Sequence, residues 1–267
     1  MQSIFDLMYD PAKRQRKRRL MIYGQDGIGK STFAAQAPTP LFIQTELGLS
    51  DIRGVKALPR CKTFLDFAGY VKQIREAETV PFEALIIDSL TGLETLVKQQ
   101  ALADYNNENS KSLDAYESIP YGAGPAWALK VWRLILDRLE EINIDKDIWV
   151  ILVGHVQIEP FKNPAGDNYD RYVPKLEKTA SAAVREWCDE YFFATQVVHV
   201  ATDGKGFQER RKAVGSGDRV LKTAGAAAFL AKRRIQMPDT IPLSWSAYLE
   251  YVEANHEESG TAALDEE

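Results

Sequence analysis

Cysteine and long apolar runs are both scarce in this sequence of 267 residues. The two cysteines, Cys61 and Cys188, stand far apart, with no C-x-x-C motif and no nearby histidine cluster. A disulfide framework and a zinc site are therefore excluded, and both thiols are expected to be reduced and structural. The longest purely apolar stretch, near Trp149 to Val153, falls far short of the ~20 residues that cross a bilayer, so no membrane partner is expected.

The sequence also lacks the apolar core of a signal peptide. Six of the seven residues from Lys13 to Arg19 are basic, but only four apolar residues follow before Gly24. A cytoplasmic location is therefore expected. The basic N-terminal segment, residues 1–19, has two interpretations: an arm that touches nucleic acid or an acidic partner, or a solvated leader.

Positive charge is not in excess over the whole chain, whose formal net charge is −5. The sequence therefore lacks the strongly basic surface that is typical of a dedicated DNA-binding domain. From His256 to Glu267 the charged residues are all acidic, and we expect residues 253–267 to form a disordered, solubilising tail. Residues 20–252, between these two ends, have the length of one α/β domain.

A complete G-x-x-x-x-G-K-[ST] phosphate-binding loop occupies residues 24–31. Its glycines let the backbone turn so that successive N–H groups face phosphate oxygens, and the start of the following helix adds partial positive charge. Lys30 is expected to reach the β- and γ-phosphates, and Ser31 to ligate Mg²⁺. The sequence therefore predicts an ATP and Mg²⁺ site, with a nucleotide-binding set of Gly24, Gln25, Asp26, Gly27, Ile28, Gly29, Lys30, Ser31 and Thr32.

Apolar runs alternate with helical periodicity along the chain, which predicts an α/β fold with a mostly parallel central sheet flanked by helices. Two strands near the C-terminus, around residues 197–201 and 219–222, are expected to form an antiparallel extension. Helices are predicted from the apolar spacing over residues 64–74, from near Leu93, and over residues 129–139. The predicted strands of the main sheet are Leu20 to Tyr23, Leu41 to Thr45, Ala84 to Asp88, Ile148 to Gly154 and Tyr191 to Val200.

Two polar segments are predicted to be exposed loops of unusual length, Tyr105 to Pro125 and Glu159 to Lys178. Long loops in compact domains are often functional, and these two are expected to border one face.

Polar residues follow three of the predicted strands and indicate the chemistry of the site. Asp88 ends an apolar strand, as does the carboxylate that holds Mg²⁺ in P-loop enzymes. Ser89 follows it, so the acid that orients an attacking water must lie elsewhere. Glu46 stands just past a buried strand, at the edge where a parallel sheet places its ligands. It is interpreted either as the general base or as a helix-capping or surface glutamate, and its position between the two motifs favours the general base.

His155 and Gln157 stand at the exit of the strand predicted over residues 148–154. Residues two apart share one face of a continuing strand, so either side chain is placed to sense the γ-phosphate. A lone histidine is more often structural, and the choice between the two residues stays open.

Four segments together resemble RecA-type ATPases, and most closely the phage-encoded RecA-like single-strand annealing ATPases of the Sak group: residues 24–31, 42–49, 86–93 and 154–157. The resemblance extends from about Leu20 to Val252 and implies a RecA-like P-loop NTPase core. It places the catalytic glutamate at Glu46 and the γ-phosphate sensor in the His155/Gln157 region.

Recombinases of this class insert basic residues into the ATP site of a neighbouring subunit. Residues 231–238 resemble that segment, so Lys232 and Arg234 are candidates for the trans-acting role, with a surface basic cluster as the alternative. A homo-oligomer, either a ring or a filament, is implied.

The family also places mobile DNA-binding loops after the third and fourth strands, which correspond here to residues 111–125 and 159–178. The candidate phosphate contacts are Lys162, Arg171, Lys175 and Lys178, and the candidate base-stacking rings are Phe161, Tyr169 and Tyr172. A plain solvated loop is the alternative, because acids are interleaved with them: Asp167, Asp170 and Glu177.

The resemblance implies a phage-encoded ATPase, acting in the host cytoplasm, that binds single-stranded DNA and promotes strand annealing, with hydrolysis stimulated by DNA. The extra domains of full-length recombinases are not recognised, so annealing with a single-strand-binding protein as partner is expected instead of autonomous strand exchange. The alternative function is a P-loop ATPase that acts on a protein partner, as a helicase loader or a signalling module. A small-molecule kinase ranks last because the middle loop, residues 106–120, contains no arginine for a lid.

Overall fold

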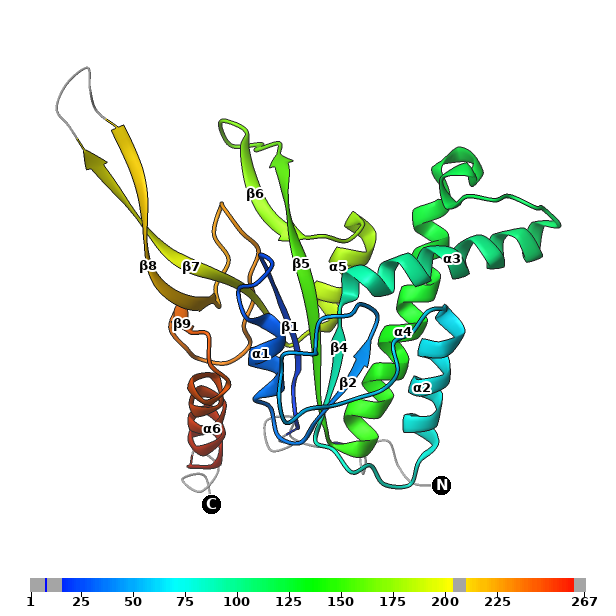
Figure 1. Cartoon of the computed structure of the whole chain (residues 1–267), viewed down its shortest axis with the longest axis horizontal. Coiled ribbons are helices and arrows are strands. Elements are labelled where there is room, and N and C mark those ends of the chain that lie inside the picture. Colours follow the sequence, from blue (N-terminus) through cyan, green and yellow to red (C-terminus); the bar gives the residue numbers. More distant parts are fainter. Residues whose placement is uncertain (1–7, 9–15, 204–209, 262–267) are drawn as a thin grey trace.

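The computed structural model describes residues 8, 16–203 and 210–261. Within these residues a sheet of nine strands has the order β3-β2-β4-β5-β1-β7-β8-β9, and β6 pairs with β5 off this path (Figure 1). The strands are β1 (Arg19–Gly24), β2 (Pro40–Gln44), β3 (Lys56–Ala57), β4 (Ala84–Asp88), β5 (Trp149–Phe161), β6 (Tyr169–Pro174), β7 (Glu190–Asp203), β8 (Arg210–Lys222) and β9 (Thr240–Pro242).

Six neighbouring strands are parallel to one another, in the spatial order β3, β2, β4, β5, β1 and β7. In contrast, β6, β8 and β9 pair antiparallel with their neighbours. Strand β1 lies in the middle, between β5 and β7, and all of its residues are buried. A strand that is covered on both faces needs a continuous apolar run, which residues 20–23 supply. The predicted α/β class, with a mostly parallel sheet and an antiparallel C-terminal extension, is confirmed.

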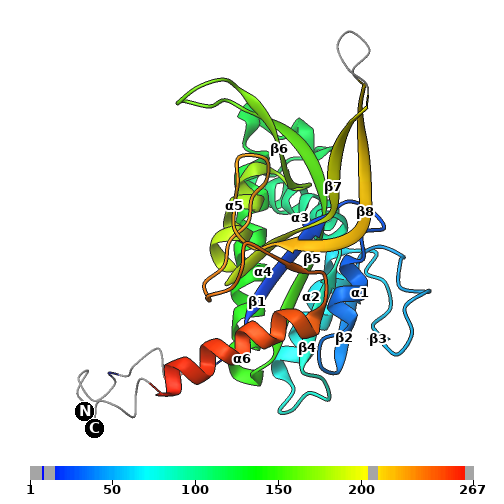
Figure 2. The same ribbon diagram turned by 90° about the vertical axis from the view of Figure 1, so that its left-hand side faces the viewer.

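Helices cover both faces of the sheet. One core joins alternate strand residues such as Met21 and Leu85 to α2 (Phe64–Glu76), α3 (Leu90–Asn109), α4 (Gly124–Lys146) and α5 (Lys178–Trp187). The other core joins the intervening residues, such as Leu20 and Ile86, to α1 (Lys30–Ala35) and α6 (Trp245–Thr261). In Figure 2, α6 lies across the face that α1 also covers. No helix in the described part of the chain combines the length and apolarity that a bilayer crossing requires.

Both predicted long loops are largely ordered into regular elements. Residues 105–109 complete α3, two short 3₁₀ turns occupy Tyr116–Ser118 and Pro120–Gly122, and α4 begins at Gly124. The Tyr105 ring of α3 packs edge-on against Trp127 of α4 at 5.5 Å between centroids, so the two helices contact each other beside this segment. The second segment forms the β5–β6 hairpin, because Glu159 to Phe161 continue β5 and pair with residues 169–171 of β6.

The two ends of the chain also differ from expectation. Arg16, Lys17, Arg18 and Arg19 form ion pairs with carboxylates of the domain, so this part of the basic segment is neither a free arm nor a solvated leader. At the other end, α6 continues beyond Val252 to Thr261, since Trp245 and Tyr248 anchor it on the aromatic core. The first part of the expected disordered tail is therefore helical, while residues 13–15 and 262–267 lie outside the described residues.

Candidate functional site

A cavity of about 340 Å³ opens at the carboxyl ends of the parallel strands. The register brings its parts together, because Gly24 of β1 lies opposite His155 of β5, and Asp88 of β4 lies opposite Val153 of the same strand. This edge is where open parallel sheets bind their ligands. The charged and hydroxyl side chains that line the cavity are Asp26, Lys30, Ser31, Thr32, Glu46, Asp88, His155 and Arg219.

The phosphate-binding loop forms one wall of this cavity. Gly29 has φ 107°, a left-handed conformation that favours glycine, and it precedes the first residue of α1. The Lys30 Nζ is buried and donates hydrogen bonds to the carbonyls of Gly24 and Gln25, at 2.9 and 2.8 Å. Burial lowers the pKa of Lys30. Six of the nine predicted loop residues line the cavity, and the exceptions are Gly24, Gln25 and Ile28.

Ser31 and Asp88, the two predicted magnesium ligands, are in direct contact. The Ser31 Oγ donates to Oδ2 of Asp88 at 2.6 Å, and burial raises the pKa of this carboxyl. Among the described residues no group of three or more His, Cys, Asp or Glu side chains could hold a metal. A hydroxyl and a carboxylate that leave the remaining positions to water and phosphate oxygens fit Mg²⁺, which keeps several waters and is held by few protein ligands.

Glu46 is held near Asp88 by the residue that precedes it. The Thr45 N–H donates to the Asp88 carbonyl at 2.9 Å, and the Thr45 hydroxyl makes two further hydrogen bonds with the backbone of Ser89. These bonds join the ends of β2 and β4, so the predicted base and the predicted metal ligand lie on one side of the cavity. Glu46 therefore belongs to the site and does not cap a helix.

The His155 imidazole lies between two carboxylates. Its Nδ1 is 2.6 Å from Oδ1 of Asp26, and its Nε2 is 3.0 Å from Oε2 of Glu46. The hydrogen bond with His155 lowers the pKa of Asp26. Because a carboxylate only accepts hydrogen bonds, both contacts are satisfied together when both ring nitrogens carry hydrogen. One side chain of β5 thus links the phosphate-binding loop to the predicted general base.

Gln157, the other sensor candidate, does not line the nucleotide cavity. Its Nε2 donates to Oε1 of Glu159 at 2.8 Å, and Gln157 is not among the described residues that line the cavity. The structure therefore brings His155 into the site and leaves Gln157 farther along the hairpin.

Lys232 and Arg234 lie beside the start of β7, at the amino ends of the parallel strands, whereas the cavity lies at their carboxyl ends. The backbone of Lys232 pairs with that of Tyr191, and its Nζ donates to the Arg185 carbonyl at 2.6 Å, in the last turn of α5. Burial lowers the pKa of Lys232. The half-exposed Arg234 forms an ion pair with Asp189 at 3.2 Å.

Arg219 also lines the cavity and was not found from the sequence. It comes from β8, in the antiparallel extension, and no motif surrounds it. Only the pairing of β8 with β7, which is itself next to β1, brings it to the phosphate-binding loop.

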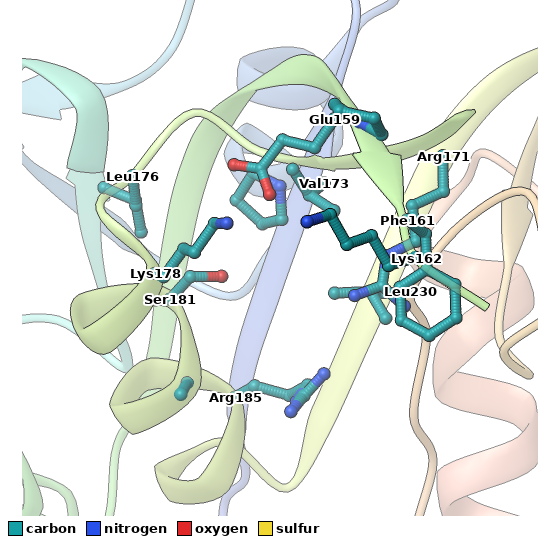
Figure 3. A pocket seen from close by; sticks show the side chains of 13 residues that line it. Glu159, Phe161, Lys162, Arg171, Val173, Leu176, Lys178, Ser181, Arg185 and Leu230 are labelled. Carbon is teal, nitrogen blue, oxygen red and sulfur yellow. The ribbon is translucent and has the colours of Figure 1, made fainter. Parts of the chain in front are cut away.

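A second cavity, of about 530 Å³, lies between the β5–β6 hairpin and α5 (Figure 3). Among the described residues Glu159 is the one acid that lines it, and the Arg171 guanidinium lies 4.2 Å from the centroid of the Phe161 ring. Figure 3 shows Lys162 and Lys178 reaching toward each other across this space. Four cations line the cavity, and none of them forms an ion pair within the described residues: Lys162, Arg171, Lys178 and Arg185.

Only some of the predicted DNA contacts line the second cavity. Phe161, Lys162, Arg171 and Lys178 line the second cavity. Lys175, Tyr169 and Tyr172 are not among its lining residues; Tyr172 stacks on Phe193 at 5.1 Å between ring centroids. Arg185 is an addition that the sequence did not indicate, because it depends on where α5 packs.

Comparisons with known proteins agree with the geometry of the nucleotide site. Residues 16–235 match a family model described as an AAA domain. The chain is similar to the SPbeta prophage-derived uncharacterized protein YorG of Bacillus subtilis (strain 168), with 24% identity over 264 residues that cover 95% of this chain and 72% of that protein. It is also similar to a crystal structure of the RadB recombinase, with a TM-score of 0.45 and 12% identity over 87% of this chain and 90% of the other. The chain belongs to the AAA domain family and is a P-loop ATPase with a mostly parallel α/β sheet.

Proposed function

We propose that this protein is a phage-encoded ATPase that binds single-stranded DNA and promotes strand annealing, in the manner of the Sak group. The observation that carries the proposal is the second cavity, where four cations and an aromatic ring meet between the β5–β6 hairpin and α5. The same strand carries His155 into the nucleotide site. A prophage-derived relative supports the phage origin.

In the nucleotide site, each residue has a role that follows from its contacts. Lys30 and the loop amides bind the phosphates of ATP, and Ser31 and Asp88 are the residues that would hold Mg²⁺. The magnesium ion neutralises phosphate charge when bound. Glu46 accepts the proton of the attacking water, and His155 orients Glu46 through the contact at its Nε2.

In the second cavity, Lys162, Lys178 and Arg185 neutralise the phosphates of a single strand, and Phe161 provides a face on which a base stacks. Arg171, already over that ring, adds a cation–π contact. Several unpaired cations beside an aromatic side chain suit a flexible polyanion in which every unit carries both a phosphate and a flat base better than an acidic peptide, in which flat rings are not a regular feature.

We further propose that the protein acts as a homo-oligomer, a ring or a filament, together with a single-strand-binding protein. Arg234 is the better candidate for the trans-acting cation, because its side chain is half exposed. Lys232 instead holds its segment against the end of α5. Insertion of both residues into a neighbour's site remains part of the proposal.

The test is the ATPase rate with and without single-stranded DNA over a salt series, with the oligomeric state recorded at each point. Stimulation is expected at low salt and should fall as salt rises, because phosphate contacts release counterions. In a Lys162→Ala/Lys178→Ala variant the ratio of stimulated to unstimulated rate should approach one. A matched variant, Lys56→Ala/Lys72→Ala, removes two exposed lysines elsewhere and should keep the wild-type ratio. Absence of stimulation at low salt would favour the alternative, an ATPase that acts on a protein partner.

A further inference from the structure

Arg219 reaches the phosphate-binding loop from a strand that belongs to another part of the sheet. Its Nη1 lies 3.2 Å from the point where a Cβ attached to Gly29 would be. It lines the nucleotide cavity together with Lys30 and Ser31. The backbone at Arg219 is fixed on both sides, opposite Gln196 of β7 and by a hydrogen bond from the Leu243 N–H at 3.0 Å. The backbone that carries this guanidinium is therefore held by the sheet and does not belong to a free loop.

Within the described residues, the Arg219 side chain has no partner, whereas two other cations of this extension have one. Lys222, on the same strand, donates to the Thr240 hydroxyl at 3.0 Å, and Arg233 pairs with Asp239 at 2.8 Å. Within the described ranges, the guanidinium of Arg219 forms no hydrogen bond and no ion pair. An arginine held beside a phosphate-binding loop without a carboxylate has a geometry that suits an anionic ligand, since its planar fork matches phosphate oxygens.

We propose that Arg219 is an in-chain nucleotide-binding residue, which contacts the phosphates of the triphosphate held by the loop of its own subunit. The proposal rests on the nucleotide site described above and adds a cation that the phosphate-binding motif does not contain. One consequence is that the site is completed in part by β8, so the antiparallel extension is joined to nucleotide binding. Arg219 then supplies a positive charge to the phosphates from the same chain, in addition to any cation that a neighbouring subunit supplies.

The first experiment measures the affinity for magnesium–ATP, without DNA, by calorimetry. Arg219→Ala should weaken binding about tenfold, the loss of one charge-assisted contact. Arg219→Lys should lie between that variant and the wild type, because a lysine keeps the charge but not the fork. Lys222→Ala removes a cation from the same strand away from the cavity and should bind as the wild type does. Thermal unfolding of each variant identifies any loss that comes from misfolding.

The outcomes separate this inference from the nucleotide site on which it rests. If Lys30→Ala loses ATP binding while a folded Arg219→Ala variant keeps the wild-type affinity, the role of Arg219 is wrong and the site stands. If Lys30→Ala also binds ATP normally, the nucleotide site itself is wrong. If Arg219→Ala fails to fold, the Arg219→Lys variant decides the question. Affinities of this variant for ATP and ADP that equal those of the wild type would overturn the proposal.

A mixing experiment tests whether Arg219 acts within its own chain. Lys30→Ala and Arg219→Ala subunits each carry one defect of the same site, so their mixture should show no more ATPase activity than the two proteins measured separately. Recovery of activity in the mixture would mean that an Arg219 from one subunit serves the loop of another, and the in-chain assignment would then be wrong.

Discussion

The two cavities of this protein differ in how their charges are satisfied. In the nucleotide cavity Arg219 has no partner within the described residues, but Lys30 donates to loop carbonyls, Ser31 donates to Asp88, and His155 lies between two carboxylates. In the second cavity the four cations have no carboxylate partner within the described residues. The first is a preorganised set of polar groups, as chemistry requires. The second keeps its positive charge available for a ligand that brings its own negative charge.

Because of this difference, the two cavities should respond differently to salt. Hydrogen-bonded groups in a partly buried site are screened weakly, whereas exposed cations that bind a polyanion lose affinity steeply as the salt concentration rises. Variants in each cavity can therefore be told apart by measurements on the same protein.

The largest effect is expected for Lys30→Ala. Removing the buried ammonium takes away the cation that the loop directs at phosphate, so the rate of ATP hydrolysis should fall by at least about 100-fold. Hydrolysis is measured at saturating nucleotide, with Lys62→Ala as an exposed control. Unchanged hydrolysis in a folded Lys30→Ala protein would remove the assignment of the phosphate-binding loop.

Glu46→Gln is expected to separate binding from chemistry. The amide keeps the shape of the side chain and can still contact His155, but it cannot accept a proton from water. Turnover should drop by about 100-fold or more while the affinity for ATP is retained. If turnover persists, another residue is the general base and the Glu46 contact with His155 is structural.

Arg185→Ala should act on the second cavity alone. Each phosphate contact contributes about 0.7 to the slope of log affinity against log salt for a single strand, so losing one contact should make the slope shallower by about that amount. Affinity for single-stranded DNA is measured at several salt concentrations, with exposed Arg53→Ala as the control. A slope equal to that of the wild type would exclude Arg185 from the DNA interface.

The smallest effect is expected for Asp26→Asn. The hydrogen bond with His155 lowers the pKa of Asp26, so this carboxylate stabilises the folded protein above its ordinary pKa and loses that contribution as the pH falls through the lowered value. The pair is exposed, and the variant should therefore unfold only roughly 1–2 °C lower than the wild type at neutral pH. Thermal unfolding at neutral and strongly acidic pH checks the sign, because the difference should shrink on acidification. A difference that grows at acidic pH would contradict it.

The parts of the site that could be predicted all follow parallel strands directly. The phosphate-binding loop, Glu46 and Asp88 each stand at the carboxyl end of an apolar run, and parallel pairing brings such ends to one edge. The same rule could not tell which of His155 and Gln157 enters the cavity. It places the end of a strand at the site, but it does not predict the hydrogen bonds of the side chains there. The continuation of β5 to Phe161, with Gln157 bonded to Glu159, settles which residue enters the cavity.

Residues from the outer elements could not be predicted in this way. Arg219 and Arg185 reach their cavities because β8 and α5 pack where they do, and that packing depends on contacts between distant parts of the chain. Helix α6 was also missed, although Trp245, Tyr248 and Val252 recur at helical spacing and all three are buried. This apolar spacing predicts a helix, but the acidic residues that follow it favoured a disordered tail.

Strand β5 has one more consequence, because it runs unbroken from Trp149 to Phe161. His155 lines the nucleotide cavity and Phe161 lines the second cavity, so this one strand carries a side chain into each of them. Should a ligand at one of them alter affinity at the other, thermodynamics requires the effect to be mutual and equal in size. If single-stranded DNA raises the affinity for ATP by some factor, ATP must raise the affinity for single-stranded DNA by the same factor.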